Sequence, residues 1–217
     1  MTTRSTPYHH GDLRTALVEA GLRLARSGGL GALGLRELTR SIGVSPNAAY
    51  RHFADLQALV AAVAVEAQQH MVGSMLDGAA ENAEHEDEAT LALRRLRAVG
   101  LGYIRFALTE PGWFEVAVLT QDEPPDDSRD LLTDSQVPAP YQLLMDALDG
   151  LESAGVISTE RRVGAEWACW SAVHGFAELA VRGPLRHQDR GTVDRLAAHV
   201  VDSIIRGVTN RDPGQHT

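Results

Sequence analysis

Residues 35–53 read LRELTRSIGVSPNAAYRHF, and this stretch predicts two short helices joined by a tight turn. Apolar residues recur at helical spacing over 35–42 and stop at Gly43, a residue type that readily closes a helix. Ser45 then offers an N-cap, and Pro46 suits the first position of a helix because its missing N–H would have no partner there. We therefore expect a second helix from Pro46 to about residue 53.

This second helix can present polar side chains outward while apolar residues hold the pair together. The expected internal contacts are Leu38, Ile42, Val44, Ala49 and Phe53, and the expected outward residues are Pro46, Asn47, Ala48, Arg51 and His52. A helix presented in this way can enter the major groove of DNA, which is about 12 Å wide. The stretch predicts a helix-turn-helix DNA-binding element, and an ordinary helical hairpin is the alternative interpretation.

Charge is unevenly distributed along this acidic chain. The 217 residues carry a formal net charge of −9, yet residues 1–53 hold seven arginines against three acids, a surplus of +4 that leaves −13 on the remainder. A basic segment beside an acidic one is expected of a protein that presents one end to phosphates. The sequence contains no lysine, so arginine or protonated histidine must supply any cation that faces phosphate.

Helical periodicity continues through the rest of the chain, and no segment alternates with the period of a strand over five or more residues. We expect an all-α protein of about nine helices, with an N-terminal three-helix head that contains the helix-turn-helix and a C-terminal helical body. We place the head at 11–71 and the body at 72–209, with flexible termini at 1–10 and 210–217.

Several classes of protein are excluded or disfavoured by the composition. The longest apolar run, 58–65, is far shorter than the ~20 residues that cross a bilayer, and no secretory signal is visible, so we expect a cytoplasmic protein with no membrane partner. Cys169 is the single cysteine, which excludes an intramolecular disulfide and a cysteine-based zinc site.

Three local patterns suggest a cofactor or a metal but lack the required context. Residues 29–34 match G-x-G-x-x-G, but a predicted helix rather than a strand precedes them, so no dinucleotide cofactor is expected. The histidine pair His9 and His10 and the acidic run 84–88 lack the spacing that aims several ligands at one point. We therefore expect no metal site.

The run IGVSPNAAYRHF, together with LQALVAAV at residues 56–63, resembles the DNA-binding element of TetR-family transcriptional regulators. The resemblance implies that Tyr50 and His52 grip phosphates and that neighbouring residues face bases or backbone. The DNA-contact candidates are Arg36, Thr39, Arg40, Ser45, Pro46, Asn47, Ala48, Tyr50, Arg51 and His52. Leu56 stands where the family usually has a lysine, so one phosphate contact must be absent or be supplied elsewhere, for example by Arg40 or Arg51.

The run WACWSAVHGFAEL at residues 167–179 resembles the C-terminal domain of the TetR branch named for a Trp-His-Gly signature. The resemblance implies a repressor that is released from DNA when a small apolar ligand binds the body. The candidates to line a ligand cavity are Phe106, Trp113, Phe114, Met145, Trp167, Trp170 and His174. For His174, a hydrogen-bonded place in the core or at an interface is the alternative.

The last two predicted helices carry more apolar surface than one chain can cover. We expect them to pair with their symmetry mates in a homodimer, and this symmetry would make the DNA operator a palindrome. The interface candidates are Val181, Leu196, Val200, Val201, Ile204 and Ile205.

Two other functions remain open from the sequence alone. One is an all-α enzyme or ligand carrier that uses His174 with acids such as Glu178, and the other is a DNA-binding protein without an effector. No second catalytic group stands at a recognisable spacing from His174, so no catalytic residue is expected.

Overall fold

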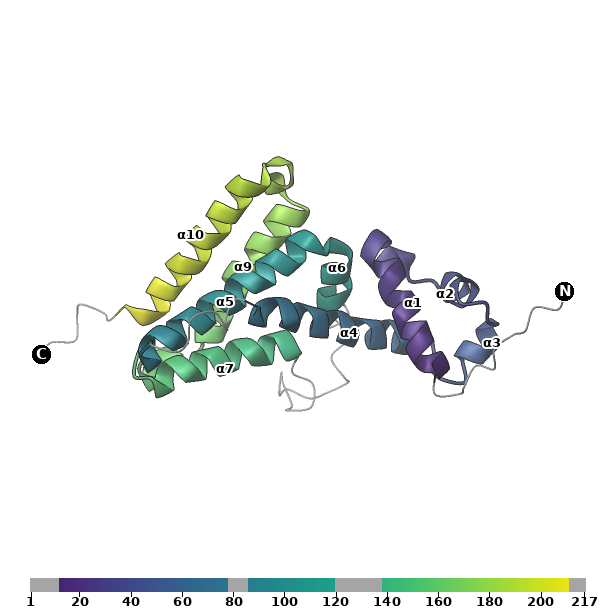
Figure 1. Ribbon diagram of the computed structural model, residues 1–217, viewed down its shortest axis with the longest axis horizontal. Coiled ribbons are helices and arrows are strands. Elements are labelled where there is room, and N and C mark those ends of the chain that lie inside the picture. The colour runs from purple at the N-terminus through teal and green to yellow at the C-terminus, as the bar shows by residue number, and fades with distance from the viewer. Residues whose placement is uncertain (1–11, 78–85, 120–137, 211–217) are drawn as a thin grey trace, which may run out of the picture. The chain divides into compact units, whose positions relative to one another are not determined.

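The computed structural model describes residues 12–77, 86–119 and 138–210, and all regular secondary structure in these ranges is helical (Figure 1). The expectation of an all-α fold is confirmed. No helix in the described ranges is long and apolar enough to cross a membrane. The histidine pair at 9 and 10 and the first part of the acidic run at 84–88 lie outside the described residues.

Contacts between elements divide the described chain into two compact units. The N-terminal unit extends from the start of the described chain to Gln68 of α4 and also includes α6. Its elements are α1 (Asp12–Gly28), η1 (Leu30–Ala32), α2 (Leu35–Ser41), α3 (Pro46–Ala49), most of α4 (Leu56–Leu76) and α6 (Pro111–Leu119). The sequence-based boundary assigned α6 to the body, whereas by its contacts this helix groups with the head.

The second unit contains the last turns of α4 and the remaining helices. These are α5 (Glu88–Thr109), α7 (Ala139–Ser153), α8 (Thr159–Arg162), α9 (Ala165–Val181), η3 (Pro184–His187) and α10 (Arg190–Thr209). Within this unit α5 packs against α7, α9 and α10, and α9 and α10 run side by side (Figure 1).

In the N-terminal unit, α6 packs on α1 through specific polar contacts. The indole N–H of Trp113 donates to the carbonyl of Leu22 at 2.7 Å. Arg26 pairs with Glu110 at 2.5 Å and places its guanidinium 5.1 Å from the centroid of the Trp113 ring. Gly112 lies so close to the α1 backbone that a Cβ would have no room. The absence of a side chain at this position therefore permits the contact.

Two long helices begin at aspartates that cap them. The Asp55 carboxylate accepts from the N–H of Ala58 at 2.7 Å at the start of α4. Asp189 accepts from the N–H of Thr192 at 2.9 Å at the start of α10, and the hydrogen bonds from Thr192 lower the pKa of the Asp189 carboxyl. Each cap satisfies a helix donor that would otherwise have no partner.

In the second unit, Gly102 lets α5 lie directly on the end of α4. A Cβ at this position would overlap the backbone of Ser74 and Met75. The Ser74 hydroxyl donates to the carbonyl of Gly102 at 2.9 Å. The next residue along α5, Tyr103, is fully buried. The two helices are therefore fixed at a separation that a larger residue does not allow.

We expect the substitution Gly102→Ala to destabilise the protein by about 1–3 kcal/mol, because backbone atoms cannot move aside as a flexible side chain does. Gly150→Ala is the matched control, since Gly150 is also helical and a Cβ added there would meet no atom within 4 Å. The control should stabilise the protein by about 0.5–1 kcal/mol through helix propensity. Chemical denaturation of both variants measures the difference, and equal stability would contradict the close approach.

Candidate nucleic-acid interface and effector cavity

The turn between α2 and α3 is closed by backbone hydrogen bonds around a glycine. Gly43 has a φ of 72°, a left-handed conformation that L side chains rarely adopt. Its N–H donates to the carbonyl of Arg40 at 3.2 Å, and the N–H of Val44 donates to the carbonyl of Thr39 at 3.0 Å. This turn therefore fixes the direction in which α3 leaves α2, as a helix-turn-helix requires.

The helix α3 is shorter than the sequence predicted. It ends at Ala49, after which the N–H groups of Arg51 and His52 donate to the carbonyls of Ala48 at 3.3 Å and Ala49 at 2.9 Å. These i→i+3 bonds are tighter than those of an α-helix. They lead the chain to Phe53, whose buried ring lies 5.0 Å from the guanidinium of Arg14 in α1.

Most of the predicted DNA contacts lie on the surface of the head. The exposed side chains are Arg36, Arg40, Ser45, Pro46, Asn47, Tyr50 and Arg51, and the half-buried ones are Ala48 and His52. Tyr50 is 52% exposed, so its ring and hydroxyl are accessible at the surface of the head. An exposed tyrosine beside polar neighbours is chemically suited to contact a phosphate.

Two details of the predicted interface differ in the structure. Thr39 is only 2% exposed, and its hydroxyl donates to the carbonyl of Leu35 at 2.9 Å. Its side chain therefore belongs to the interior of the head and not to the outward face. The side chain of Ser45 makes no capping hydrogen bond, and only its backbone carbonyl accepts from Ala48. Its exposed hydroxyl is consequently not committed to the cap.

Arg40 pairs with Glu37 at 2.6 Å on the exposed surface of α2. Ion pairs between solvent-exposed side chains contribute at most about 1 kcal/mol. Arg40 can therefore exchange the carboxylate for a DNA phosphate at small cost. This makes it a suitable source for the phosphate contact that Leu56 cannot supply.

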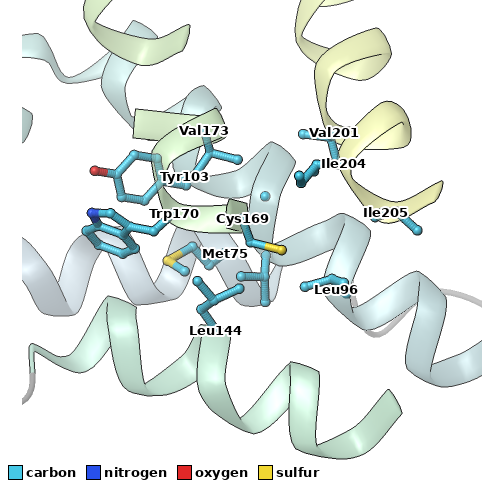
Figure 2. A pocket seen from close by; sticks show the side chains of 12 residues that line it. Met75, Leu96, Tyr103, Leu144, Cys169, Trp170, Val173, Val201, Ile204 and Ile205 are labelled. Atoms are coloured by element: carbon cyan, nitrogen blue, oxygen red, sulfur yellow. The ribbon is translucent and has the colours of Figure 1, made fainter. Parts of the chain in front are cut away.

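The second unit contains a partly open cavity, whose space amounts to about 370 Å³ when the open solvent at its mouth is included (Figure 2). All five long elements of this unit contribute to its wall. The lining residues are Met75 of α4, Leu96, Val99, Gly100 and Tyr103 of α5, Leu144 of α7, Cys169, Trp170 and Val173 of α9, and Val201, Ile204 and Ile205 of α10. None of these side chains is charged at neutral pH, and the wall is almost wholly apolar.

The aromatic residues of the wall keep their polar atoms away from the cavity. Tyr103 and His174 are joined by a hydrogen bond of 2.9 Å between the hydroxyl and Nδ1. The His174 ring stacks on Trp170 at a centroid distance of 6.4 Å. Figure 2 shows the Tyr103 oxygen and the Trp170 nitrogen on the side away from Leu96 and Ile205. Burial, with a smaller effect of Glu178, raises the pKa of Tyr103, so its hydroxyl stays neutral.

The structure brings only one of the predicted cavity residues, Trp170, into the wall. Trp113 and the buried Phe114 belong to α6 in the N-terminal unit. Trp167 is 53% exposed, and His174 lies behind the wall against Tyr103. The remaining candidates do not line the cavity; they are the buried Phe106 and the half-buried Met145.

The sequence analysis missed most of the wall because its residues carry no distinguishing signal. Their shared property is an apolar side chain at helical spacing, which every core residue also has. The wall residues not singled out beforehand are Met75, Leu96, Val99, Gly100, Tyr103, Leu144, Cys169 and Val173. Three more, Val201, Ile204 and Ile205, had been assigned to the dimer interface.

Both parts of the chain match models of known families. Residues 17–63 match the family described as bacterial regulatory proteins, tetR family. Residues 96–204 match the tetracyclin repressor-like C-terminal domain. An uncharacterized HTH-type transcriptional regulator, YobS of Bacillus subtilis (strain 168), is 25% identical over 173 residues, which cover 80% of this chain and 81% of that protein.

Solved structures share this fold. A Rhodococcus sp. RHA1 protein of unknown function is 26% identical, with a TM-score of 0.73 and coverage of 95% of this chain and 100% of that one. A TetR family regulator from Marinobacter aquaeolei VT8 is 17% identical, with a TM-score of 0.57 and coverage of 88% and 94%. A TetR variant from Acinetobacter baumannii AYE in complex with minocycline is 19% identical, with a TM-score of 0.56 and coverage of 89% and 94%.

The fold and these matches define a DNA-binding transcriptional regulator of the helix-turn-helix class. Within that class, the chain belongs to the TetR family. Members of this family bind DNA and a ligand and work as dimers. The matched C-terminal model describes a different family from the Trp-His-Gly branch, so that finer resemblance is not confirmed.

The thiol of Cys169, which lines the cavity, can be probed by alkylation. The thiol is buried, and burial together with the charge of Glu166 raises its pKa from 9.0 to about 11. The thiolate is the reactive form of cysteine. At pH 8 the native protein therefore holds a much smaller fraction of thiolate at this position than the unfolded chain does.

We expect iodoacetamide at pH 8 to modify Cys169 at least about 100-fold more slowly in the native protein than in the denatured protein, because two pKa units separate the two thiols. Mass spectrometry follows the reaction cleanly, since the sequence contains no other cysteine. Modification at the same rate before and after denaturation would show that the thiol does not face a buried apolar wall.

Proposed function

We propose that this TetR-family regulator represses transcription from a palindromic operator and is released by a small, uncharged, apolar ligand held in the cavity of the second unit. The observation that carries the proposal is the pairing of two features in one chain. One is a closed helix-turn-helix with an exposed polar face, and the other is a cavity without a charged wall residue.

Direct contact with DNA is proposed for the exposed residues around α3. Asn47 can accept and donate hydrogen bonds at a base edge, a combination suited to adenine. Tyr50, Arg51 and the half-buried His52 follow on the turn after α3 and are suited to phosphates. Arg36 and Arg40 occupy exposed positions on α2, the first helix of the helix-turn-helix, and add positive charge there. Base contacts would give sequence specificity, and phosphate contacts would give position and affinity.

We expect Asn47→Ala to cost roughly 1–3 kcal/mol of binding at one base position and to relax specificity there. Tyr50→Phe should instead weaken binding to all sequences alike, because a phosphate contact carries no base information. Arg23→Ala is the matched control, since this exposed residue is basic but lies on α1. Gel-shift titrations against the chain's own upstream DNA and base-substituted variants measure these effects.

If Asn47→Ala and Tyr50→Phe both bind operator with unchanged affinity and specificity, the proposed placement of the interface fails. If wild-type protein binds bulk DNA as tightly as any single palindrome, the proposal of a specific operator fails in favour of a nonspecific DNA-binding protein.

The chemistry of the wall defines the class of ligand. An ionised group moved into an apolar site without a partner is strongly disfavoured, and an unpaired polar group costs several kcal/mol. The hydroxyl of the wall residue Tyr103 already bonds to His174 Nδ1. The favoured occupant is therefore a neutral aromatic or alkyl compound with few hydrogen-bonding groups. The position of α4, one continuous helix with residues in both units, gives a path for coupling to the head.

We expect the neutral dye N-phenylnaphthylamine to bind once per chain and its sulfonated analogue, anilinonaphthalene sulfonate, to bind at least about tenfold more weakly, because only the analogue brings a charge into the wall. Fluorescence titration measures both affinities. Cys169→Phe, which fills the cavity, is the control that should abolish dye binding. Tighter binding of the sulfonated dye at that same position would contradict the proposed ligand class.

The same ligand class should act on DNA binding with reciprocal coupling. A coupling of about 1–3 kcal/mol corresponds to a ~5- to 150-fold change of affinity, and operator must alter dye affinity by the same factor. Equal dye affinity with and without operator would leave the DNA-binding function intact and remove the proposal that an occupant of this cavity releases DNA.

We also propose that α9 and α10 form the homodimer interface. Leu179 of α9 is 47% exposed and Leu196 of α10 is 38% exposed. Val181 and Val200 are half-buried in the single chain. Val201 differs from these because it is 1% exposed and packs inside its own chain. The proposed interface therefore uses the outer faces of α9 and α10, without Val201.

A further inference from the structure

The arginines described in the head fall into two groups that differ in their partners. Half of them pair with carboxylates; these pairs are Arg23 with Glu19, Arg26 with Glu110 and Arg40 with Glu37. The others are exposed and belong to no ion pair between described side chains; they are Arg14, Arg36 and Arg51. Their charge is therefore available to a ligand without the loss of an ion pair.

Arg14 is the member of this second group that has no task in the interface proposed so far. Arg36 and Arg51 belong to the helix-turn-helix, whereas Arg14 lies in the first turn of α1. A cation in the first turn of a helix meets the positive end of the helix dipole, so the charge of Arg14 does not stabilise α1. The position of this charge therefore points to a role outside its own helix.

The contact that holds Arg14 brings it to the turn after α3. Its guanidinium lies over the Phe53 ring, 5.0 Å from the centroid, and α1 and α3 are in contact (Figure 1). The N–H of Phe53 donates to the carbonyl of Ala49 at 3.1 Å, which ties the ring to the end of α3. The exposed Tyr50 and Arg51 lie on the same turn. Arg14 thus adds a cation, from a distant part of the sequence, beside the residues proposed to hold phosphates.

An aromatic partner suits an arginine that binds phosphate. A carboxylate partner would cancel the charge of the guanidinium and occupy its N–H donors, whereas a ring face does neither. The Phe53 ring also restricts the Arg14 side chain before DNA arrives, which lowers the entropy lost on binding. The planar guanidinium can then donate two parallel hydrogen bonds to one phosphate.

We propose that Arg14 is a phosphate-contacting residue of the DNA interface and that the Phe53 ring holds it in place. The inference rests on the proposed DNA-binding function and extends the interface from α2 and α3 to α1. A major groove about 12 Å wide runs between two strands of phosphates, so a helix inserted into it has phosphates on both sides. The chain has no lysine, and Leu56 at the start of α4 is uncharged. Arg14 supplies a cation at the turn that leads into α4.

The test is the salt dependence of DNA binding by the full chain, measured by fluorescence anisotropy. The two probes are a duplex with the palindrome selected from the chain's own upstream DNA and a random duplex of the same length. Each phosphate that a protein neutralises contributes about 0.9 to the slope of log affinity against log salt concentration. Arg14→Gln should therefore reduce the slope of a dimer with two heads by about two on both duplexes, and its affinity at about 0.1 M salt should fall at least about tenfold.

Two further variants separate a phosphate contact from a structural role. Arg14→Lys keeps the positive charge and should keep most of the wild-type slope. Arg23→Gln is the matched control, because Arg23 is an exposed arginine of the same helix that pairs with Glu19, and it should leave the slope unchanged. If Arg14 only packed on Phe53, Arg14→Gln would change affinity by one factor at every salt concentration and would not change the slope.

An unchanged slope in Arg14→Gln would overturn the inference, whatever the affinity of that variant, and would leave the proposed operator binding standing. Equal reductions in Arg14→Gln and Arg23→Gln would also overturn it, because the effect would then follow net charge and not a contact. A wild-type chain that binds both duplexes equally would remove the proposed specific operator, while the slopes of the variants would still decide the role of Arg14.

Discussion

The close approach of α5 to its neighbours is the constraint on which the second unit depends. Gly102 brings the α5 backbone onto the end of α4, and Gly100 brings it within reach of Val201 in α10. Helices normally pack about 8–10 Å apart, at a distance set by the side chains at the contact. Gly100 and Gly102 lie two residues apart on α5 and therefore permit close contacts on different sides of this helix, with Val201 of α10 and with the end of α4. The larger side chains beside them bound the cavity.

A glycine also permits a close contact between two helices in the N-terminal unit, where polar side chains add to the contact. Gly112 brings α6 onto α1, and the indole N–H of Trp113 donates to the carbonyl of Leu22 in α1. Arg26 then covers the indole and pairs with Glu110. The helix that follows α5 in the chain is thereby tied to the first helix of the head. Along the chain, α4 and the α5–α6 connection each pass between the second unit and the head.

Polarity is divided between the two sites in a way that matches their different tasks. The outward residues around α3 are polar or charged and solvated, so they can exchange water for phosphates and base edges at small cost. No side chain of the cavity wall is charged at neutral pH, and the Tyr103 hydroxyl is already bonded to His174 Nδ1. A charged occupant would therefore lose its hydration without compensation.

The sequence by itself determined the helical class, the helix-turn-helix and its outward polar residues, because these follow from local rules. Turn glycines and the 3.6-residue period act over a few neighbours, so Gly43 and the exposed Asn47 could be predicted before any tertiary contact was known. Thr39 was predicted to face outward because a threonine in a short helix can lie on either face, and only the packing of α2 determined that it is buried.

Only the tertiary structure could show which residues line the cavity. They come from five helices spread from Met75 to Ile205, and they share an apolar character with the whole core. The aromatic rings of Trp113 and Phe114 look equally suited to a cavity or a core, and the hydrogen bond that ties Trp113 to α1 spans 91 residues of chain. Burial is a property of surfaces that meet in space, and no local pattern records which distant surface an apolar side chain will meet.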